Sequence, residues 1–479
     1  LEAASGTTGN ASGAYSIDDQ GRLIIDGSPS HAAVSRDAGV VFLPDLDSAD
    51  DDLGLTFMAR QNMGLTVSDL AGRYNVVEFY HSHGEEADSG DEILVGAGRL
   101  LFDPDAPDNP EVQWQDEANS QDWALQYESN TYGLDGSGRL TIDDSPAYAP
   151  VSADAGLVIV PDMDASEDGG VGLRFAVKAS DSLTVSDLFG RYHMAGFYHN
   201  DPSGGDNELD TVSGYVNFDG AGQWRSETLI SGQDGEVQET KGGDYGIDDN
   251  GRLIIDGQTT YGAVSPDGSI VVLPDMDPDE GGDVGIFFLV RAPLRALAVN
   301  SADAAMDSST STVIAGSDWK NTYNGIPDNF APMSDIVSFD ASNVEDLSRF
   351  YFDITGLFGI PADLLMLKLK SGNANSRHFF YATRTEATDP DDYIDGIMWL
   401  TDPDDDSYLG PFSTALNPDK TYRAHFVIED DGDYDANPNP GEIADPFVLG
   451  AGIRSTSEDS SNGGSGSGSS GCFIHSLGR

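Results

Sequence analysis

A unit of about 115 residues recurs along this chain, and that recurrence constrains the fold more than any other feature. One pattern, Tyr-x-Ile/Leu-Asp-x-x-Gly-Arg-Leu-x-Ile-Asp, occurs three times and begins at Tyr15, Tyr132 and Tyr245. A second pattern, Leu-Thr-Val-Ser-Asp-Leu-x-Gly-Arg-Tyr, occurs only twice, from Leu65 and Leu183. We therefore expect the chain to open in the middle of a unit. A residue type that recurs at equivalent positions is more typical of architecture than of one active site.

Within each unit, short apolar or alternating segments are separated by turns rich in Gly, Asp and Pro. Residues 156–161 form an apolar run that ends at Pro161, and residues 171–178 alternate between apolar and polar side chains. Such segments are typical of β-strands in a meander, barrel or sandwich. Seven or eight strands per unit can close into a small barrel, which removes exposed strand edges. The sequence therefore predicts an all-β protein made of tandem small antiparallel β-barrels.

The composition changes along the chain and predicts six segments. Residues 318–454 are again β-rich but lack the repeat, so a β-sandwich is expected there. A Gly/Ser-rich end is expected to be flexible. The predicted segments are 1–64, the second half of a barrel unit; 65–182 and 183–293, two barrel units; 294–317, a small polar linker; 318–454, the sandwich; and 455–479, the tail.

Acidic residues dominate the charge of the chain. Its 479 residues include 24 Lys and Arg against 83 Asp and Glu, for a net charge of −59. A field of this sign repels nucleic acid and anionic membranes, so neither is an expected partner. No apolar run approaches the roughly 18 residues that a membrane helix needs, so no direct membrane span is expected. The acidity fits calcium-binding loops, salt adaptation or plain solubility.

One acidic turn follows the apolar strand in each unit, which gives three such turns along the chain. Alternating carboxylates on a turn can converge on one hard cation, which prefers six to eight oxygen ligands. The alternative is a solvated hairpin turn. The candidate Ca²⁺ ligands in these turns are Asp45 and Asp47; Asp162, Asp164 and Asp168; and Asp275, Asp277 and Asp279.

A fourth acidic cluster, between residues 429 and 442, is denser and is the best single candidate for a metal site. Its side chains alternate along the chain, and a glutamate follows as a bidentate ligand. The candidate Ca²⁺ ligands are Asp431, Asp433, Asp435, Asn437 and Glu442.

Several of the few cations recur at fixed positions of the unit. Arg22, Arg139 and Arg252 share one position, whereas Arg73 and Arg191 share another. We expect each guanidinium to pair with an aspartate or to cap a barrel end, because its planar fork suits a carboxylate.

The order of motifs resembles the lipocalin-like up-and-down barrel, in which a Gly-x-Tyr/Trp element opens the first strand. The matching residues are Gly72-Arg-Tyr74 and Gly190-Arg-Tyr192. The resemblance implies barrels that often carry a ligand inside. Whether these barrels are hollow is left open by the sequence.

The C-terminal part resembles the bacterial "choice-of-anchor" surface domains. The resemblance covers about 100 residues and rests on the strand 350–354, the Asp-rich loop before Asp445-Pro446 and the Gly/Ser spacer that follows. The end, Gly471-Cys472-Phe473-Ile474, is similar to the Gly-rich Cys-Phe-Ile tails of bacterial proteins sorted to the cell surface. These resemblances imply an extracellular or outer-surface location, with Cys472 as an anchoring residue. As the single cysteine, Cys472 permits no intrachain disulfide.

No catalytic motif stands out, so we do not expect an enzyme. The predicted function is that of a secreted or cell-surface structural protein, stabilised by Ca²⁺, that forms a filament or matrix through β-strand complementation. The missing half-unit motivates the predicted assembly. The partial unit of residues 1–64 could be completed upstream, could pack on its neighbour, or could accept strands from another chain. Self-association or other surface proteins are the expected partners. The alternative is a surface-anchored adhesive protein that binds a glycan or small ligand in its barrels.

Overall fold

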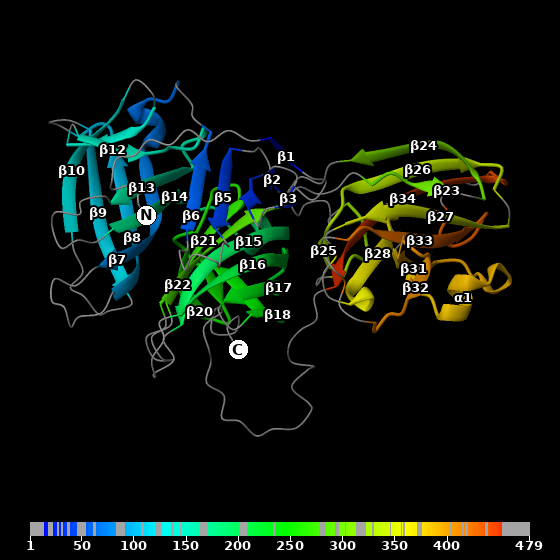
Figure 1. The fold of residues 1–479 in the computed structure, drawn as a ribbon. Helices are drawn as coiled ribbons and strands as arrows, with labels where there is room; N and C mark the ends of the chain where they lie inside the picture. Colours follow the sequence, from blue (N-terminus) through cyan, green and yellow to red (C-terminus); the bar gives the residue numbers. More distant parts are fainter. Residues whose placement is uncertain are drawn as a thin grey trace.

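A computed structural model of the chain is all-β, as predicted, with three bodies in a row (Figure 1). Only short helical turns interrupt the strands of the described residues. The structure describes residues 14–17, 23–25, 28–29, 32–35, 39–45, 54–60, 64–82, 92–106, 110–119, 127–135, 138–143, 145–162, 171–200, 208–232, 235–276, 284–292, 297–301, 303–312, 322–327, 330–344, 346–355, 357, 360–370, 376–402, 404–413, 416, 420–435 and 439–452.

The central body is a closed antiparallel barrel. Each strand is hydrogen-bonded to the next along the chain, and the last strand returns to pair with the first. The up-and-down order is the one that the motif order predicts. The strands are β15 (Phe189–Asn200), β16 (Glu208–Asp219), β17 (Gln223–Gly232), β18 (Gly235–Ile247), β19 (Arg252–Ile255), β20 (Gln258–Val264), β21 (Ile270–Asp275) and β22 (Val284–Arg291).

The preceding unit forms an eight-stranded antiparallel sheet with the same order of strands. Its path runs β12-β11-β10-β9-β8-β7-β14-β13, and a bridge between Val151 and Val158 joins the two ends. The strands are β7 (Gly72–Ser82), β8 (Glu92–Asp103), β9 (Glu111–Asn119), β10 (Tyr127–Leu134), β11 (Leu140–Ile142), β12 (Ser145–Ala149), β13 (Leu157–Asp162) and β14 (Val171–Lys178).

The interior of the central barrel is filled by side chains. Tyr192, Phe218, Trp224, Tyr245 and Phe287 belong to one buried hydrophobic cluster inside it. The rings of Tyr192 and Phe218 meet edge to face with centroids 5.2 Å apart, and those of Phe218 and Tyr245 with centroids 4.8 Å apart. The described part of this barrel is thus a packed core, as in other small eight-stranded barrels.

The two repeated motifs have structural roles. In the Leu-Thr-Val-Ser-Asp-Leu motif, Thr66 and Asp69 form a capping box on the short helical turn η2 (Val67–Leu70). Thr184 and Asp187 do the same on η3 (Val185–Asp187). In the Gly-Arg-Tyr motif, the tyrosine hydroxyl donates to a backbone carbonyl across the barrel; Tyr74 reaches the oxygen of Ala155 at 2.7 Å. Both motifs therefore close one end of a barrel.

The N-terminal residues contain only the later strands of a unit. Two three-stranded sheets, β1-β2-β3 and β4-β5-β6, correspond in sequence to the stretch from the end of β18 to β22. No counterpart of β15, β16 or β17 occurs among the residues described before η2. The strands are β1 (Tyr15–Ile17), β2 (Leu23–Ile25), β3 (Ser28–Pro29), β4 (Ala33–Val34), β5 (Val40–Asp45) and β6 (Gly54–Ala59). We call this set the half-unit.

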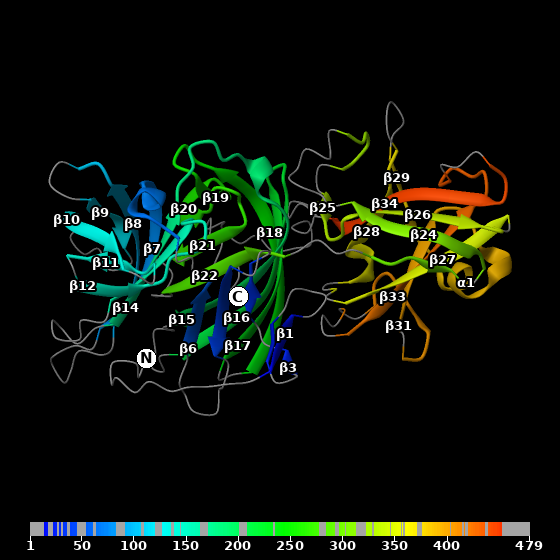
Figure 2. The same cartoon turned by 90° about the horizontal axis from the view of Figure 1, so that it is seen from above.

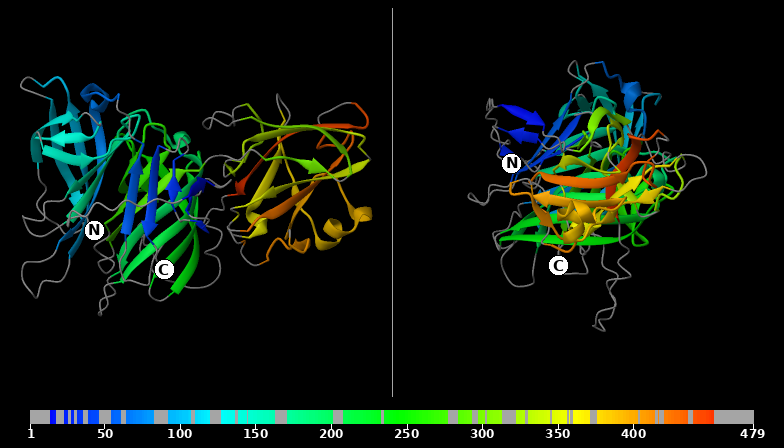
Figure 3. Two further views of the ribbon diagram at one scale, coloured as in Figure 1. Left: turned by 45° about the horizontal axis from the view of Figure 1, so that its top comes forward. Right: turned by 90° about the vertical axis from the view of Figure 1, so that its right-hand side faces the viewer.

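The outer face of the half-unit packs on both barrels, and the blue strands β5 and β6 lie along the green barrel in Figures 2 and 3. Phe57, Phe175 and Phe288 occupy the same position in β6, β14 and β22. Their ring centroids lie 4.8 Å apart for Phe57–Phe175, 5.3 Å for Phe57–Phe288 and 4.8 Å for Phe175–Phe288. Phe42 stacks on Phe288 at 4.4 Å. Three equivalent faces thus share one hydrophobic core between the units.

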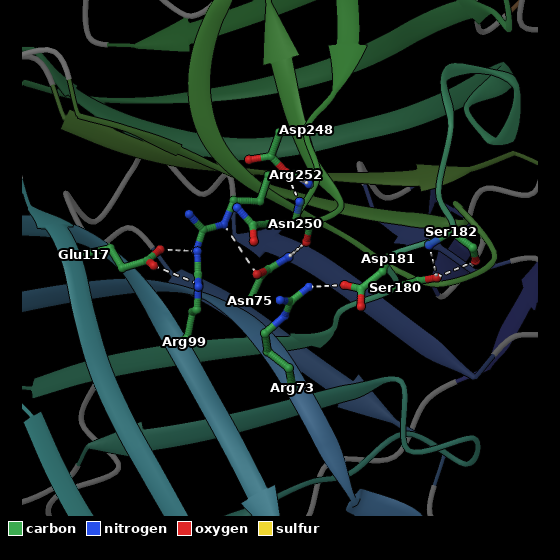
Figure 4. A network of polar contacts seen from close by, with 10 residues as sticks. All are labelled: Arg73, Asn75, Arg99, Glu117, Ser180, Asp181, Ser182, Asp248, Asn250 and Arg252. Carbon is green, nitrogen blue, oxygen red and sulfur yellow. Dashed lines mark hydrogen bonds and ion pairs between the residues drawn. The ribbon is translucent and has the colours of Figure 1, made fainter.

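A polar network joins the two barrels beside this core (Figure 4). Glu117 of β9 forms ion pairs with Arg99 of β8, at 2.7 Å, and with Arg252 of β19. Asn75 of β7 donates to the backbone carbonyl of Asn250 at 3.0 Å. Because Arg252 is buried, its pairing with Glu117 from the other barrel compensates a charge that burial would otherwise destabilise.

Two of the four described repeat arginines pair with an aspartate, as predicted, whereas Arg252 and Arg191 have other partners. Arg139 pairs with Asp135 at 2.7 Å, and Arg73 pairs with Asp181. Arg191 is buried and donates to the side chain of Asn217 at 3.1 Å. Arg22 lies outside the described residues.

The third body is a β-sandwich of two six-stranded sheets around one hydrophobic core. One sheet contains β23 (Asn300–Ser301), β27 (Leu347–Ile354), β33 (Tyr422–Glu429), β31 (Ile397–Asp402), β30 (Phe380–Tyr381) and β32 (Ser407–Leu409). The other contains β24 (Ala305–Thr312), β26 (Ile336–Ser342), β34 (Glu442–Gly452), β28 (Leu364–Lys368), β29 (Arg377–His378) and β25 (Phe330–Pro332). A short helix, α1 (Arg384–Thr388), and the turn η7 (Pro390–Asp392) lie beside the first sheet.

The expected linker over residues 294–317 is wrong for much of its length. Strands β23 and β24 lie within it and complete one edge of each sandwich sheet. Leu297 and Val299 are buried in the sandwich core. The composition misled because β24 is an edge strand whose side chains are mostly exposed, so Ser and Thr suffice there.

Candidate functional sites

Among the described residues, no strand covers the inner face of the half-unit, and this separates it from the two complete units. Tyr15, Tyr132 and Tyr245 occupy one position of the repeat, but Tyr15 is 79% exposed whereas Tyr132 and Tyr245 are 5% and 6% exposed. The hydroxyl of Tyr245 donates to the carbonyl of Leu188 at 2.7 Å, beside the turn η3. Burial raises the pKa of Tyr132 to about 12. The turn and first strands that bury these tyrosines have no described counterpart over Tyr15.

The edge strand β6 shows the same difference. Met58 is 42% exposed, whereas its equivalents Ala176 and Leu289 are fully buried. In the complete units, β14 pairs with β7 and β22 pairs with β15, but β6 pairs only with β5 among the described strands. An unpaired edge next to exposed apolar side chains is a ready surface for another strand.

The three predicted turn sites fall largely outside the described residues. Asp45, Asp162 and Asp275 end β5, β13 and β21, and each pairs with a glycine of the next, antiparallel strand. Asp275 is buried. The candidates outside the described residues are Asp47, Asp164, Asp168, Asp277 and Asp279.

The fourth acidic cluster brings together a different set of residues from the predicted one. Asp430, Asp431 and Asp435 each place a carboxylate oxygen within 4.8 Å of the others, the one such group of three among the described residues. One carboxylate oxygen of Asp430, Oδ1, is buried and has no hydrogen-bond partner. The other, Oδ2, accepts from the backbone N–H of Gly441 at 2.6 Å. An orphaned buried oxygen beside two further carboxylates fits a hard cation such as Ca²⁺.

Two predicted ligands of that cluster have other partners. Asp433 forms an ion pair with Arg377 at 2.6 Å. Glu442 accepts from the side chain of Asn439 at 3.1 Å. Asn437 lies outside the described residues. Alternation along the sequence did not reveal Asp430 because the chain turns at Asp431, whose φ is +58°, so that neighbouring carboxylates face one another.

A pocket of about 440 Å³ opens on the outer face of the sandwich sheet that contains β27, β33 and β31. Tyr351, His425 and Trp399 lie side by side on these three strands. Trp399 stacks on His425 with centroids 5.0 Å apart, and Tyr393 of the neighbouring turn lies 5.7 Å from Trp399. Tyr351 and Tyr393 are partly exposed at this concavity, whereas Trp399 is buried. No sequence motif predicts the pocket, because its residues come from separate strands.

The polar groups of the pocket are largely held in place by one another. Arg423 makes a bidentate pair with Asp353, at 2.8 and 3.2 Å, and its guanidinium lies over the ring of Tyr351. His425 Nε2 and Thr401 Oγ1 are 3.1 Å apart. Burial lowers the pKa of His425 to about 4, so the imidazole is neutral at pH 7. The pocket therefore combines aromatic faces with fixed polar groups.

The remaining predictions lie beyond what the structure describes. Cys472 and the Gly/Ser tail lie outside the described residues. Within the described part of the chain, none of the helices has the length and apolar character needed to cross a bilayer. Searches of protein-family models and of curated proteins find no match to this chain.

Proposed function

We propose that this chain is a structural protein of the cell surface or extracellular space that assembles by β-strand complementation. The observation that carries the proposal is the exposure of Tyr15 and Met58, whose equivalents are buried in both complete units. An apolar surface with an open strand edge favours one more strand over solvent. The tail with Cys472 then serves attachment, and Ca²⁺ at Asp430, Asp431 and Asp435 stabilises the last domain.

The complete units indicate what the complementary segment looks like. In each, the capped Thr-Val-Ser-Asp turn precedes a strand that carries Gly-Arg-Tyr at or next to its start and pairs with the last strand of the same unit. By analogy, the partner of β6 is a polypeptide with this turn and three strands like β15, β16 and β17. Its turn would accept the hydroxyl of Tyr15, as η3 does for Tyr245.

The assembly is tested by mixing the full chain with a labelled fragment of residues 183–232, which carries η3 and β15–β17. We expect a complex in sedimentation velocity and slower hydrogen exchange of the β6 amides. Met58→Asp places a charge on the docking face and should abolish the complex. Leu101→Asp is the matched control, because Leu101 is 43% exposed on a complete unit. A complex that survives Met58→Asp would refute docking at this face.

The filament form is tested separately by negative-stain electron microscopy of the chain and a partner that carries the fragment. Filaments that depend on Met58 and vanish on chelation support an ion-stabilised building block. Discrete particles in both conditions would contradict the filament while leaving strand docking to the sedimentation experiment.

The pocket of the sandwich favours a second candidate function, the binding of a neutral sugar ring. The partly exposed rings of Tyr351 and Tyr393 can stack on the apolar face of a sugar, and Arg423 can bind its hydroxyls. Arg423 pairs with Asp353 and Arg349 with Asp303, and Asp406 also lines the pocket, so no excess positive charge is present to attract an acidic sugar. The strongly negative protein also disfavours one. The alternative in which a ligand binds inside a barrel needs a hollow barrel, whereas this candidate does not.

Calorimetric titration of the full chain with cellohexaose, maltohexaose, mannohexaose and an oligogalacturonate tests the pocket. We expect one of the neutral oligosaccharides to bind, and Tyr351→Ala to weaken that binding about tenfold. Phe412→Ala, which removes a 76% exposed aromatic ring of the same domain away from the pocket, should change nothing. Binding of the acidic probe alone would contradict the neutral sugar.

A further inference from the structure

A lysine and an aspartate face each other in the core of the sandwich. Lys368 ends β28 and Asp445 lies in the adjacent strand β34. The register pairs Lys368 with Phe447, so Asp445 is its diagonal neighbour, two residues away on the same face of the sheet. Diagonal neighbours lie within reach of a long side chain.

That face of the sheet is the inner one, against the core. Met366 of β28 and Phe447 of β34 lie on the same face of the sheet as Lys368 and Asp445, and both belong to the core cluster. Phe339 of β26 pairs directly with Asp445 and is buried as well. The side chains of Lys368 and Asp445 are 0% and 1% exposed. The pair is thus enclosed by apolar and aromatic groups without access to water.

Among the described residues, the polar side-chain atoms of Lys368 and Asp445 contact only each other. Lys368 Nζ contacts Asp445 Oδ1 directly. Neither Nζ nor the two carboxylate oxygens of Asp445 has a hydrogen bond with a described group. A buried ion pair is stable only when further hydrogen bonds satisfy its remaining protons and lone pairs. An ammonium and a carboxylate in this position leave most of their protons and lone pairs without a hydrogen bond.

The surroundings also favour the neutral form of Lys368. Burial lowers the pKa of Lys368 to about 7, although the charge of Asp435 acts in the opposite direction. A neutral amine is a nucleophile, whereas an ammonium is not.

We propose that Lys368 and Asp445 are joined by an amide bond between their side chains. The proton of the ammonium passes to the carboxylate, and the freed lone pair of Nζ attacks Cγ of Asp445. A C–N bond forms, one C–O bond breaks, and the oxygen leaves with two protons as water. No electrons are transferred, so no oxidant or other reactant is needed. The product is a neutral secondary amide with one donor and one acceptor, which the apolar core tolerates far better than two charges.

The bond would tie β28 to β34 covalently. β34 is the central strand of its sheet, since it pairs with β26, β28 and β25. The link therefore fixes the sandwich core against forces that pull on the chain. This inference does not depend on the proposed function.

Mass spectrometry of the full chain under denaturing conditions tests the bond, because the mass does not depend on folding. We expect the chain to be lighter than its sequence by one water, with no cleavage by trypsin after Lys368 and one peptide that joins the two residues. Lys368→Arg and Asp445→Ala should restore the full mass. Asp445→Asn should give the same final mass as the wild type, because condensation then releases ammonia.

A matched control exists in the same domain. Lys420 and Asp402 form an ion pair at 2.5 Å, but their side chains are 31% and 21% exposed. Peptides that contain Lys420 should be recovered unlinked. A wild-type chain with the full mass and ordinary cleavage after Lys368 would overturn the proposal.

Discussion

Phe175 and Phe288 occupy the same position in successive barrels and pack against each other edge to face, with ring centroids 4.8 Å apart. Both also contact Phe57 of the half-unit. We expect Phe288→Ala to lower the free energy of unfolding by about 3–5 kcal/mol, because it leaves a cavity where three units meet. Urea denaturation measures the loss. Phe412→Ala is the control and should change the stability by less than about 0.5 kcal/mol.

The charge between the barrels gives a second prediction. Glu117→Gln keeps the shape of the side chain but leaves the buried guanidinium of Arg252 without its carboxylate. Removal of one partner from a buried pair costs about 3–5 kcal/mol. Thermal unfolding should show the loss. Asp135→Asn, which breaks the more exposed pair with Arg139, should cost less than about 1 kcal/mol. Equal losses would contradict the importance of the contact between barrels.

The sandwich should lose stability in mild acid through His425. Burial, together with the charges of Arg349 and Arg423, lowers the pKa of His425 to about 4. In the unfolded chain the pKa is about 6.5, so between these values the unfolded state binds a proton that the folded state does not. Stability therefore falls as the pH drops from about 6.5 to about 4, by up to about 3 kcal/mol. His425→Gln should flatten this part of the pH profile in calorimetry, and an unchanged slope would contradict the assignment.

Calcium should stabilise the chain through Asp430 rather than through Asp433. Free Ca²⁺ at 100 times its dissociation constant adds about 2.7 kcal/mol to the free energy of unfolding. Asp430→Asn should remove the calcium-dependent rise in melting temperature, because it weakens a ligand of the carboxylate cluster. Asp433→Asn should keep the rise, because Asp433 pairs with Arg377. The same loss in both variants would favour a general charge effect.

The all-β class and the closed barrel were predictable from the sequence because their determinants are local. Alternation along 171–178 predicts a strand, and the repeated turns indicate where strands end. The strand β14 is buried on both faces, because Phe175 and Val177 pack between the units while Ala176 lies in the core of its own unit. The Gly-Arg-Tyr and Thr-Val-Ser-Asp motifs mark one end of each unit because they act within it.

Contacts between distant segments could not be read in the same way. The pairing of Glu117 with Arg252 depends on how two barrels sit together, which no periodicity reports. The pocket at Trp399 and His425 needs the order of strands in the sandwich sheet. The sequence weakly indicates that Lys368 is buried, since it lies on the same face of β28 as Leu364 and Met366. That strand is buried on both faces. The partner of Lys368, Asp445, lies roughly 80 residues later, and only the sheet register brings the two together.

The three phenylalanines that meet between the units imply an approximate threefold rotation, since each contacts both of its equivalents. A threefold rotation closes on itself after three units, unlike the translation that relates the domains of a linear array. A segment that completes the half-unit would therefore finish a compact triad and could not add a fourth barrel at the same axis. The length of any filament would have to come from joining triads, and its repeat distance would be the width of a triad rather than of a barrel.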